Sequence, residues 1–189
     1  IRRMCSTQGR EVVQLKRIRI MNILLGDLKP GEYRNVTEAE YQQLKELLSS
    51  QEYASAREST LNAHYTSPAI IRSIYDTLDR MGFEKGNVLE PAMGIGNFFG
   101  MLPEKMQESR LYGVELDGIT GRIARQLYPK ADIKISGFEK TDYPNDFFDV
   151  AVGNVPFGQY KVADKQYDKN NFLIHDYFFA KTLDKVRPG

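Results

Sequence analysis

The stretch that decides the fold is Asn87-Val88-Leu89-Glu90-Pro91-Ala92-Met93-Gly94-Ile95-Gly96-Asn97-Phe98. Its first four residues form a short, mainly apolar run of the kind found in buried β-strands. Gly94 and Gly96 then allow a sharp backbone turn, and a helix is expected from about Asn97 with its free amides facing the turn. A strand, a glycine-rich turn and a helix in this order predict the first unit of an α/β fold.

Strand-like and helix-like segments alternate around this stretch. Ser67 and Pro68 open a helix that ends at Gly82. Further strands are expected at 111–115, 132–135 and 148–152, and further helices at 117–128 and 175–186. Such alternation implies right-handed crossovers and a parallel sheet covered on both faces. We therefore predict an α/β, Rossmann-like domain over residues 61–189 with about four parallel strands.

Residues 1–60 have a different pattern, which predicts a helical N-terminal arm. Apolar spacing over 11–25 fits an amphipathic helix. Thr37 and Glu40 form a capping-box pattern that opens a second helix to about Leu48, and a third helical piece is expected near 52–61. Residues 1–30 carry seven basic residues against two acidic ones. This excess suits either a solvated helix face or a surface that binds along the phosphate backbone of a nucleic acid.

Composition limits the classes of function. The 189 residues are 41% hydrophobic and 27% charged with a net charge of +1, values of an ordinary globular protein that give no global case for nucleic-acid binding. No apolar run approaches the roughly 18–20 residues that span a membrane, and no signal peptide is evident, so we expect a cytoplasmic protein without membrane contact. One cysteine and two histidines predict neither a disulfide nor a metal site.

The glycine turn and the following strand indicate a nucleoside cofactor. Glu115 ends that strand, where a carboxylate can accept hydrogen bonds from ribose hydroxyls. The dinucleotide fingerprint requires a glycine three residues after Gly96, and that position is Phe99. A pyrophosphate is therefore less favoured than S-adenosylmethionine, which carries no phosphate. The alternative is a glycine-rich turn beside a surface glutamate, without a ligand.

A second motif, Asn154-Val155-Pro156-Phe157, follows the fourth predicted strand. The Asn154 side-chain oxygen and the Val155 carbonyl can both accept hydrogen bonds from an amino group. Pro156 stiffens the turn, and Phe157 offers a ring for stacking on a flat group. Asn-x-Pro also forms ordinary turns between a strand and a loop. These four residues are the candidate catalytic residues.

Three motifs, at 64–68, 90–98 and 154–157 in chain order, resemble those of the gamma class of adenine-specific DNA methyltransferases. Residues 90–98 are similar to the Asp-Pro-Ala-Cys-Gly-Ser-Gly-x-Phe signature of that class, and residues 154–157 to its Asn-Pro-Pro-Tyr/Phe catalytic motif. Residues 64–68 resemble the Tyr/Phe-Thr-Pro element that holds the methionine end of the cofactor. Over about residues 60–189 the chain resembles modification subunits of type I restriction systems, and more closely the methylase region of large helicase–methylase proteins of phages and conjugative elements.

The resemblance implies S-adenosylmethionine-dependent methylation of the exocyclic amino group of adenine in double-stranded DNA, with the base flipped out. It also implies partners in the rest of a larger polypeptide, or in a separate specificity or helicase module. In the candidate catalytic motif, Asn154 and the Val155 carbonyl would hold the amino group while Phe157 stacks on the base. The implied cofactor-binding residues are Tyr65, Thr66, Glu90, Pro91, Ala92, Gly94, Gly96, Asn97, Phe98, Glu115, Leu116 and Phe138.

The chain departs from the family at two notable positions. Val155 stands where the family has its first proline, whose contribution is a backbone carbonyl that valine also has. The family has an aspartate before the phenylalanine that lies against the cofactor adenine, and this chain has Gly137 there. Glu139 and Asp142 are both candidates to replace that aspartate.

Two other functions stay open. An Asn-Pro-Pro-Tyr motif also serves methylation of glutamine in proteins, although the element at 64–68 favours DNA. A catalytically weak module that binds cofactor or DNA, such as an anti-restriction module, is compatible with Val155 and Gly137. Because sheets of this family have seven strands, we expect the 189-residue chain to be a fragment of the catalytic domain. We expect it to be inactive alone and able to self-associate through an open sheet edge.

The segment that links the catalytic motif to the last helix is polar. Residues 158–171 are expected to form a long mobile loop, in which Tyr160 and Tyr167 are solvated unless they contact DNA. Phe178 and Phe179 are predicted to be core residues, and His175 to lie at a helix start.

Overall fold

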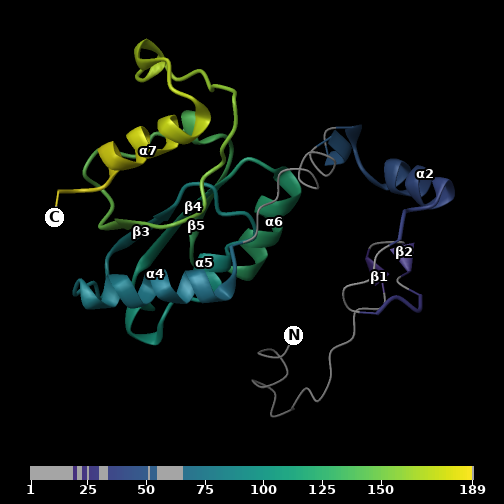
Figure 1. The fold of residues 1–189 in the computed structure, drawn as a ribbon, viewed down its shortest axis with the longest axis horizontal. Helices are drawn as coiled ribbons and strands as arrows, with labels where there is room; N and C mark the ends of the chain where they lie inside the picture. The colour runs from purple at the N-terminus through teal and green to yellow at the C-terminus, as the bar shows by residue number, and fades with distance from the viewer. Residues whose placement is uncertain are drawn as a thin grey trace. The chain divides into compact units, whose positions relative to one another are not determined.

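The computed structural model describes residues 19–20, 23–24, 26–29, 34–50, 52–54 and 66–188. The chain divides into two compact units, Ile1–Tyr53 and Ala54–Gly189, and each is described by itself. Figure 1 shows their elements. No helix in the described ranges is both long enough and apolar enough to cross a membrane.

The first unit contains a short hairpin and a helix. Strands β1 (Arg19–Ile20) and β2 (Ile23–Leu24) pair antiparallel. The helix predicted over 11–25 is therefore wrong at these residues, where isoleucines favour extended backbone. Helix α2 (Glu38–Leu47) has the predicted capping box, since Glu40 donates its amide to Thr37 Oγ1 and returns its carboxylate to the Thr37 amide. Of the third predicted helix, residues 52–54 are helical and the rest lies outside the described residues.

The second unit is built on a four-stranded parallel sheet in the order β5-β4-β3-β6. The strands are β3 (Asn87–Glu90), β4 (Arg110–Glu115), β5 (Asp132–Ile135) and β6 (Val150–Ala151). The predicted parallel sheet is thus confirmed, and β6 is shorter than the expected 148–152. Strand β3 lies between β4 and β6, so the winding of the sheet reverses there, which is the place where open α/β sheets bind ligands.

Helices cover both faces of this sheet (Figure 1). They are α4 (Pro68–Arg80), α5 (Asn97–Gly100), α6 (Gly118–Leu127) and α7 (Ile174–Lys185). Successive strand residues face opposite sides. Accordingly, Val88 belongs to a core cluster with Ile71 and Tyr75 of α4, whereas Leu89 belongs to another with Tyr177 and Phe178 of α7. The fold is the predicted α/β, Rossmann-like fold.

Three side-chain predictions near α7 can be judged. Phe178 is buried as predicted, but Phe179 is 60% exposed, because one helical step turns it away from the sheet. His175 lies in the first turn of α7 as predicted. Beyond α7, Val186 forms a parallel bridge with Phe148, so the chain returns to the sheet beside β6.

Candidate cofactor and catalytic site

Three candidate residues lie at or just after the carboxyl ends of neighbouring strands. Glu90 ends β3, Glu115 ends β4, and Asn154 follows β6. Because the strands are parallel, these ends share one edge of the sheet. The edge includes the point between β3 and β6 where the winding reverses.

The glycine turn after β3 requires glycine at two positions. Gly94 and Gly96 have φ angles of 57° and 82°, in the left-handed region that favours glycine. A Cβ atom at Gly96 would also lie 2.5 Å from Cε2 of Tyr128. Tyr128 in addition donates its hydroxyl to the Gly96 carbonyl at 2.6 Å. Tyr128 therefore packs against the turn and hydrogen-bonds to it. The sequence analysis did not identify Tyr128 as a residue of this site.

Glu115 joins the end of β4 to this turn. Its Oε2 accepts from the Gly94 amide and its Oε1 from the Asp117 amide, both at 2.7 Å. Burial raises the pKa of Glu115, and the two amides act in the opposite direction. The carboxylate keeps further acceptor positions on both oxygens, and the neighbouring Leu116 is largely exposed.

Glu90 is a buried acid at the centre of the site. It is only 2% exposed, and its Oε2 has no hydrogen-bond partner among the described residues. Burial raises the pKa of Glu90 well above its usual value, the negative charge of Glu115 adds to the rise, and the Phe99 amide opposes it. A buried orphaned oxygen is uncommon in folded proteins and suggests a polar partner.

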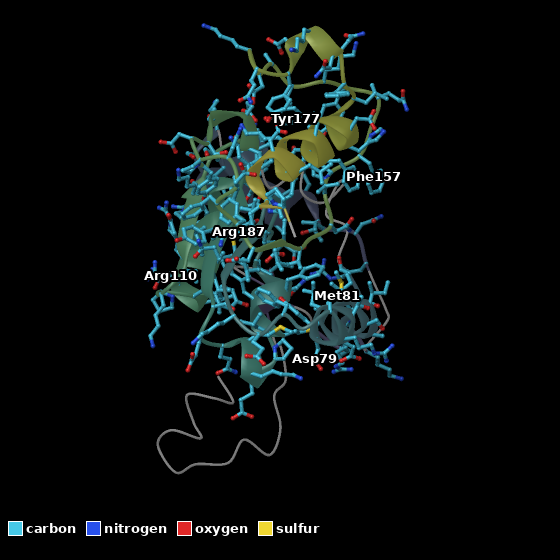
Figure 2. The ribbon with its side chains drawn as sticks, turned by 90° about the vertical axis from the view of Figure 1, so that its left-hand side faces the viewer. Asp79, Met81, Arg110, Phe157, Tyr177 and Arg187 are labelled. Carbon is cyan, nitrogen blue, oxygen red and sulfur yellow. The ribbon has the colours of Figure 1, made fainter. Side chains whose placement is uncertain are left out.

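The candidate catalytic motif begins directly beside the glycine turn. A Cβ atom at Gly153 would lie 3.6 Å from both Glu90 Cγ and Pro91 Cδ. The next residue, Asn154, is exposed at the same edge. The side chain of Val155 is partly buried and packs against the core cluster that contains Tyr177 and Phe178 of α7. Phe157 is 59% exposed, and Figure 2 shows it at the surface near α7.

The segment after β5 distinguishes the two candidate acids. The carboxylate of Glu139 folds back over Gly137, so that a Cβ atom there would overlap Glu139 Oε1. The side chain of Asp142 is 89% exposed and pairs with Lys134. The Phe138 ring is buried in the core, 5.1 Å from the ring of Phe178.

The structure thus brings together most of the expected site. The residues gathered at the carboxyl edge are Glu90, Pro91, Ala92, Gly94, Gly96, Asn97, Phe98, Glu115, Leu116 and Asn154. Phe98 itself points into the core beside α4. Thr66 directly precedes Ser67, the cap of α4, while Tyr65 lies outside the described residues.

The chain was compared with known protein families, curated proteins and solved structures. No model of a known protein family matches the chain. The chain is 33% identical over 135 residues to "Defense against restriction protein B" of Escherichia phage P1, covering 69% of this chain and 6% of that protein. It is 32% identical over 104 residues to "Type II methyltransferase M.CvrRI" of Paramecium bursaria Chlorella virus XZ-6E, covering 54% of this chain and 26% of that protein. The chain therefore spans a minor part of both relatives.

Among solved structures, the chain is similar to one described as a modification subunit of a putative type I restriction enzyme from Vibrio vulnificus YJ016. The TM-score is 0.50 at 18% identity, covering 82% of this chain and 37% of that one. Two further similar structures, with TM-scores of 0.47 and 0.41, are described as a putative S-adenosyl-L-methionine-dependent methyltransferase from Methanococcus maripaludis and as an O-methyltransferase from Bacillus cereus in complex with SAH. The chain thus shares its α/β fold with that modification subunit, and it has a relative named as a type II methyltransferase.

Proposed function

We propose that the second unit binds S-adenosylmethionine at the carboxyl edge of β3 and β4 and transfers its methyl group to the exocyclic amino group of adenine in DNA. The observation that carries the proposal is the contact between β6 and β3, in which the Val152 amide donates to the Leu89 carbonyl at 2.9 Å. This contact sets a motif suited to holding an amine directly beside a turn suited to holding a nucleoside.

The residues at the edge fit this cofactor better than a dinucleotide. Phe99 stands where the dinucleotide fingerprint has its third glycine, and its side chain is buried there, which disfavours a pyrophosphate. Glu115 would accept hydrogen bonds from the ribose hydroxyls, as acids at the end of the second strand do in nucleotide-binding α/β folds. The orphaned Oε2 of Glu90 is an acceptor suited to the ammonium group of the methionine part. When bound, the cofactor supplies a methyl group on a positively charged sulfur.

The catalytic motif supplies acceptors and a stacking surface. Asn154 Oδ1 and the Val155 carbonyl would accept hydrogen bonds from the amino group and keep its nitrogen lone pair directed at the methyl group. The exposed ring of Phe157 would stack on a flipped base. Catalysis would then come from positioning and from fixed acceptors.

We further propose that Glu139, rather than Asp142, accepts the amino group of the cofactor's adenine ring. The Glu139 carboxylate lies over the backbone of Gly137, where a side chain of that residue would begin. Asp142 is exposed and paired with Lys134.

Two relatives support related but different activities. The relative named as a type II methyltransferase supports methyl transfer as part of restriction–modification. The relative named for defense against restriction supports a second candidate function, in which the domain holds cofactor or DNA and protects without turnover. Methylation of protein glutamine is the third candidate, because the catalytic motif suits an amide nitrogen as well.

Methyl transfer from radiolabelled S-adenosylmethionine separates these functions. The natural full-length protein would be incubated with DNA and with protein acceptors, beside its Asn154→Ala variant. The proposal predicts label in DNA, as N6-methyladenine, and its loss in the variant. Label in protein instead, or cofactor binding without any transfer, would contradict it, and so would an unchanged rate in Asn154→Ala.

A further inference from the structure

The segment between the catalytic motif and α7 is a folded lobe. We define the lysine lobe as residues 158–173, which include the 3₁₀ turn η3 (Asp168–Asn170). Its two ends are tied together, since the Ile174 amide donates to the Tyr160 carbonyl at 2.9 Å. Tyr167 is 6% exposed and donates its hydroxyl to Asp184 of α7 at 2.7 Å. The prediction of a solvated Tyr167 is therefore wrong.

The acidic side chains of the lobe are used within the protein. Asp164 Oδ2 accepts from the Tyr177 hydroxyl at 2.8 Å and from Lys181 Nζ at 3.0 Å. Figure 2 shows Tyr177 beneath the lobe. Asp168 Oδ1 accepts from the Asp164 amide at 2.8 Å and so closes the turn before η3. The negative charges of the lobe are thus held by internal donors.

The basic side chains of the lobe face solvent. Lys161, Lys165 and Lys169 are all exposed. Lys165 lies in the turn before η3, and Lys169 lies within η3. Lys161 Nζ donates to Asn171 Oδ1 at 2.6 Å, which places it beside the end of η3. Asp164 is turned toward Lys181 and Asp168 is exposed, so three exposed lysines face one exposed carboxylate and the outer surface of the lobe is positive.

We infer that the lysine lobe contacts the phosphate backbone of the DNA that the catalytic motif acts on, an inference that rests on the DNA substrate proposed above. The lobe directly follows Phe157, so phosphates next to a base stacked on that ring would lie near its lysines. Exposed Phe157 and Tyr160 beside three lysines also have the composition of surfaces that bind unpaired nucleotides.

DNA suits this surface better than an acidic protein partner does. Each lysine that neutralises a phosphate releases counterions, so binding weakens steeply with salt. Such contacts need exposed, mobile ammonium groups rather than a shaped pocket, and the lobe offers these groups on a backbone fixed to α7.

The experiment measures the affinity of the natural full-length protein for duplex DNA at several salt concentrations. Three proteins are compared: the wild type, the lobe variant Lys161→Ala/Lys165→Ala/Lys169→Ala, and a control variant with the same loss of charge. The control variant is Lys85→Ala/Lys105→Ala/Lys130→Ala. Its lysines are exposed and precede β3, β4 and β5, at the opposite edge of the sheet.

We expect the slope of log Kd against log salt to fall by about 0.9 for each phosphate that a lysine no longer neutralises, and so by up to about 2.7 in the lobe variant. The control variant should keep the wild-type slope, and a triple Lys→Arg variant of the lobe should keep it as well. Equal slopes in the lobe and control variants would overturn the inference. Cofactor binding and methyl transfer by the wild type test the proposed function separately, because neither depends on the difference in slope.

Discussion

The ammonium group of Lys181 lies 3.0 Å from Oδ2 of Asp164, and the two side chains are only 4% and 12% exposed. The same ammonium donates to the carbonyl of Phe138 at 2.8 Å. One buried cation therefore joins the lysine lobe, helix α7 and the segment after β5 that carries Glu139. The lobe that follows the candidate catalytic motif is thus tied to the segment after β5 through this group.

Replacing Lys181 by methionine is expected to lower the free energy of unfolding by about 3–5 kcal/mol, because it leaves the Asp164 carboxylate buried without its cation. Urea denaturation measures the effect. Lys85→Met is the matched control, since Lys85 pairs with Glu108 at the exposed surface and its loss should change the unfolding midpoint far less. Equal costs for the two variants would contradict a structural role of the buried pair.

Substitution of Gly96 by alanine should damage the cofactor turn. The left-handed φ angle and the contact with Tyr128 both oppose a Cβ atom, so a loss of about 1–3 kcal/mol in stability is expected together with weaker cofactor binding. Gly118→Ala is the matched control, because a Cβ atom there meets nothing within 4 Å and no positive φ is required. Thermal unfolding and calorimetric titration report both effects. A Gly96→Ala protein that behaves like Gly118→Ala would show that the turn is not constrained as described.

The stability of the protein should fall as pH rises through the titration of Glu90. The folded protein raises the pKa of this carboxyl, so the folded state holds a proton that the unfolded state releases above about pH 4.3. The free energy of unfolding therefore decreases as the pH rises from about 4.3 to the pKa of Glu90 in the folded protein. Glu90→Gln should flatten this part of the curve of unfolding free energy against pH. The same downward slope in both proteins would show that Glu90 ionises without penalty.

The position of Glu139 over Gly137 predicts a rescue. Glu139→Ala should weaken S-adenosylmethionine binding and reduce discrimination against an analogue whose adenine lacks the amino group. In the Glu139→Ala background, Gly137→Asp should partly restore the affinity for S-adenosylmethionine and the discrimination against the analogue. The reason is that removal of the Glu139 carboxylate frees the space beside Gly137. Binding isotherms with the cofactor and the analogue measure the discrimination. Unchanged discrimination in Glu139→Ala would assign the adenine contact to another group.

The sequence predicted the sheet and the glycine turn well, since both depend on local patterns. The apolar run before Glu90, the left-handed positions Gly94 and Gly96, and the cap at Ser67 are each determined by a few neighbouring residues. The hairpin at 19–24 was missed, because a short segment rich in isoleucine suits helix and strand alike.

The contacts that the sequence could not predict join residues far apart in the chain. Tyr128 meets Gly96, and Lys181 meets Asp164 and Phe138, only once the sheet and α7 have formed. A lysine within the pattern of a helix ordinarily indicates a solvated face, and the sequence offers no signal that Lys181 is buried. The same holds for Tyr167, whose polar neighbours predicted a solvated loop.

Calorimetric titration of the protein with S-adenosylmethionine, beside NAD, tests the cofactor site most directly. We predict saturable binding of S-adenosylmethionine at one site, no binding of NAD, and at least a tenfold loss of affinity in Glu115→Ala, which is about 1.4 kcal/mol. No heat with S-adenosylmethionine, equal binding of NAD, or an unchanged affinity in Glu115→Ala would contradict the assignment of the carboxyl edge of β3 and β4 as the site for this cofactor.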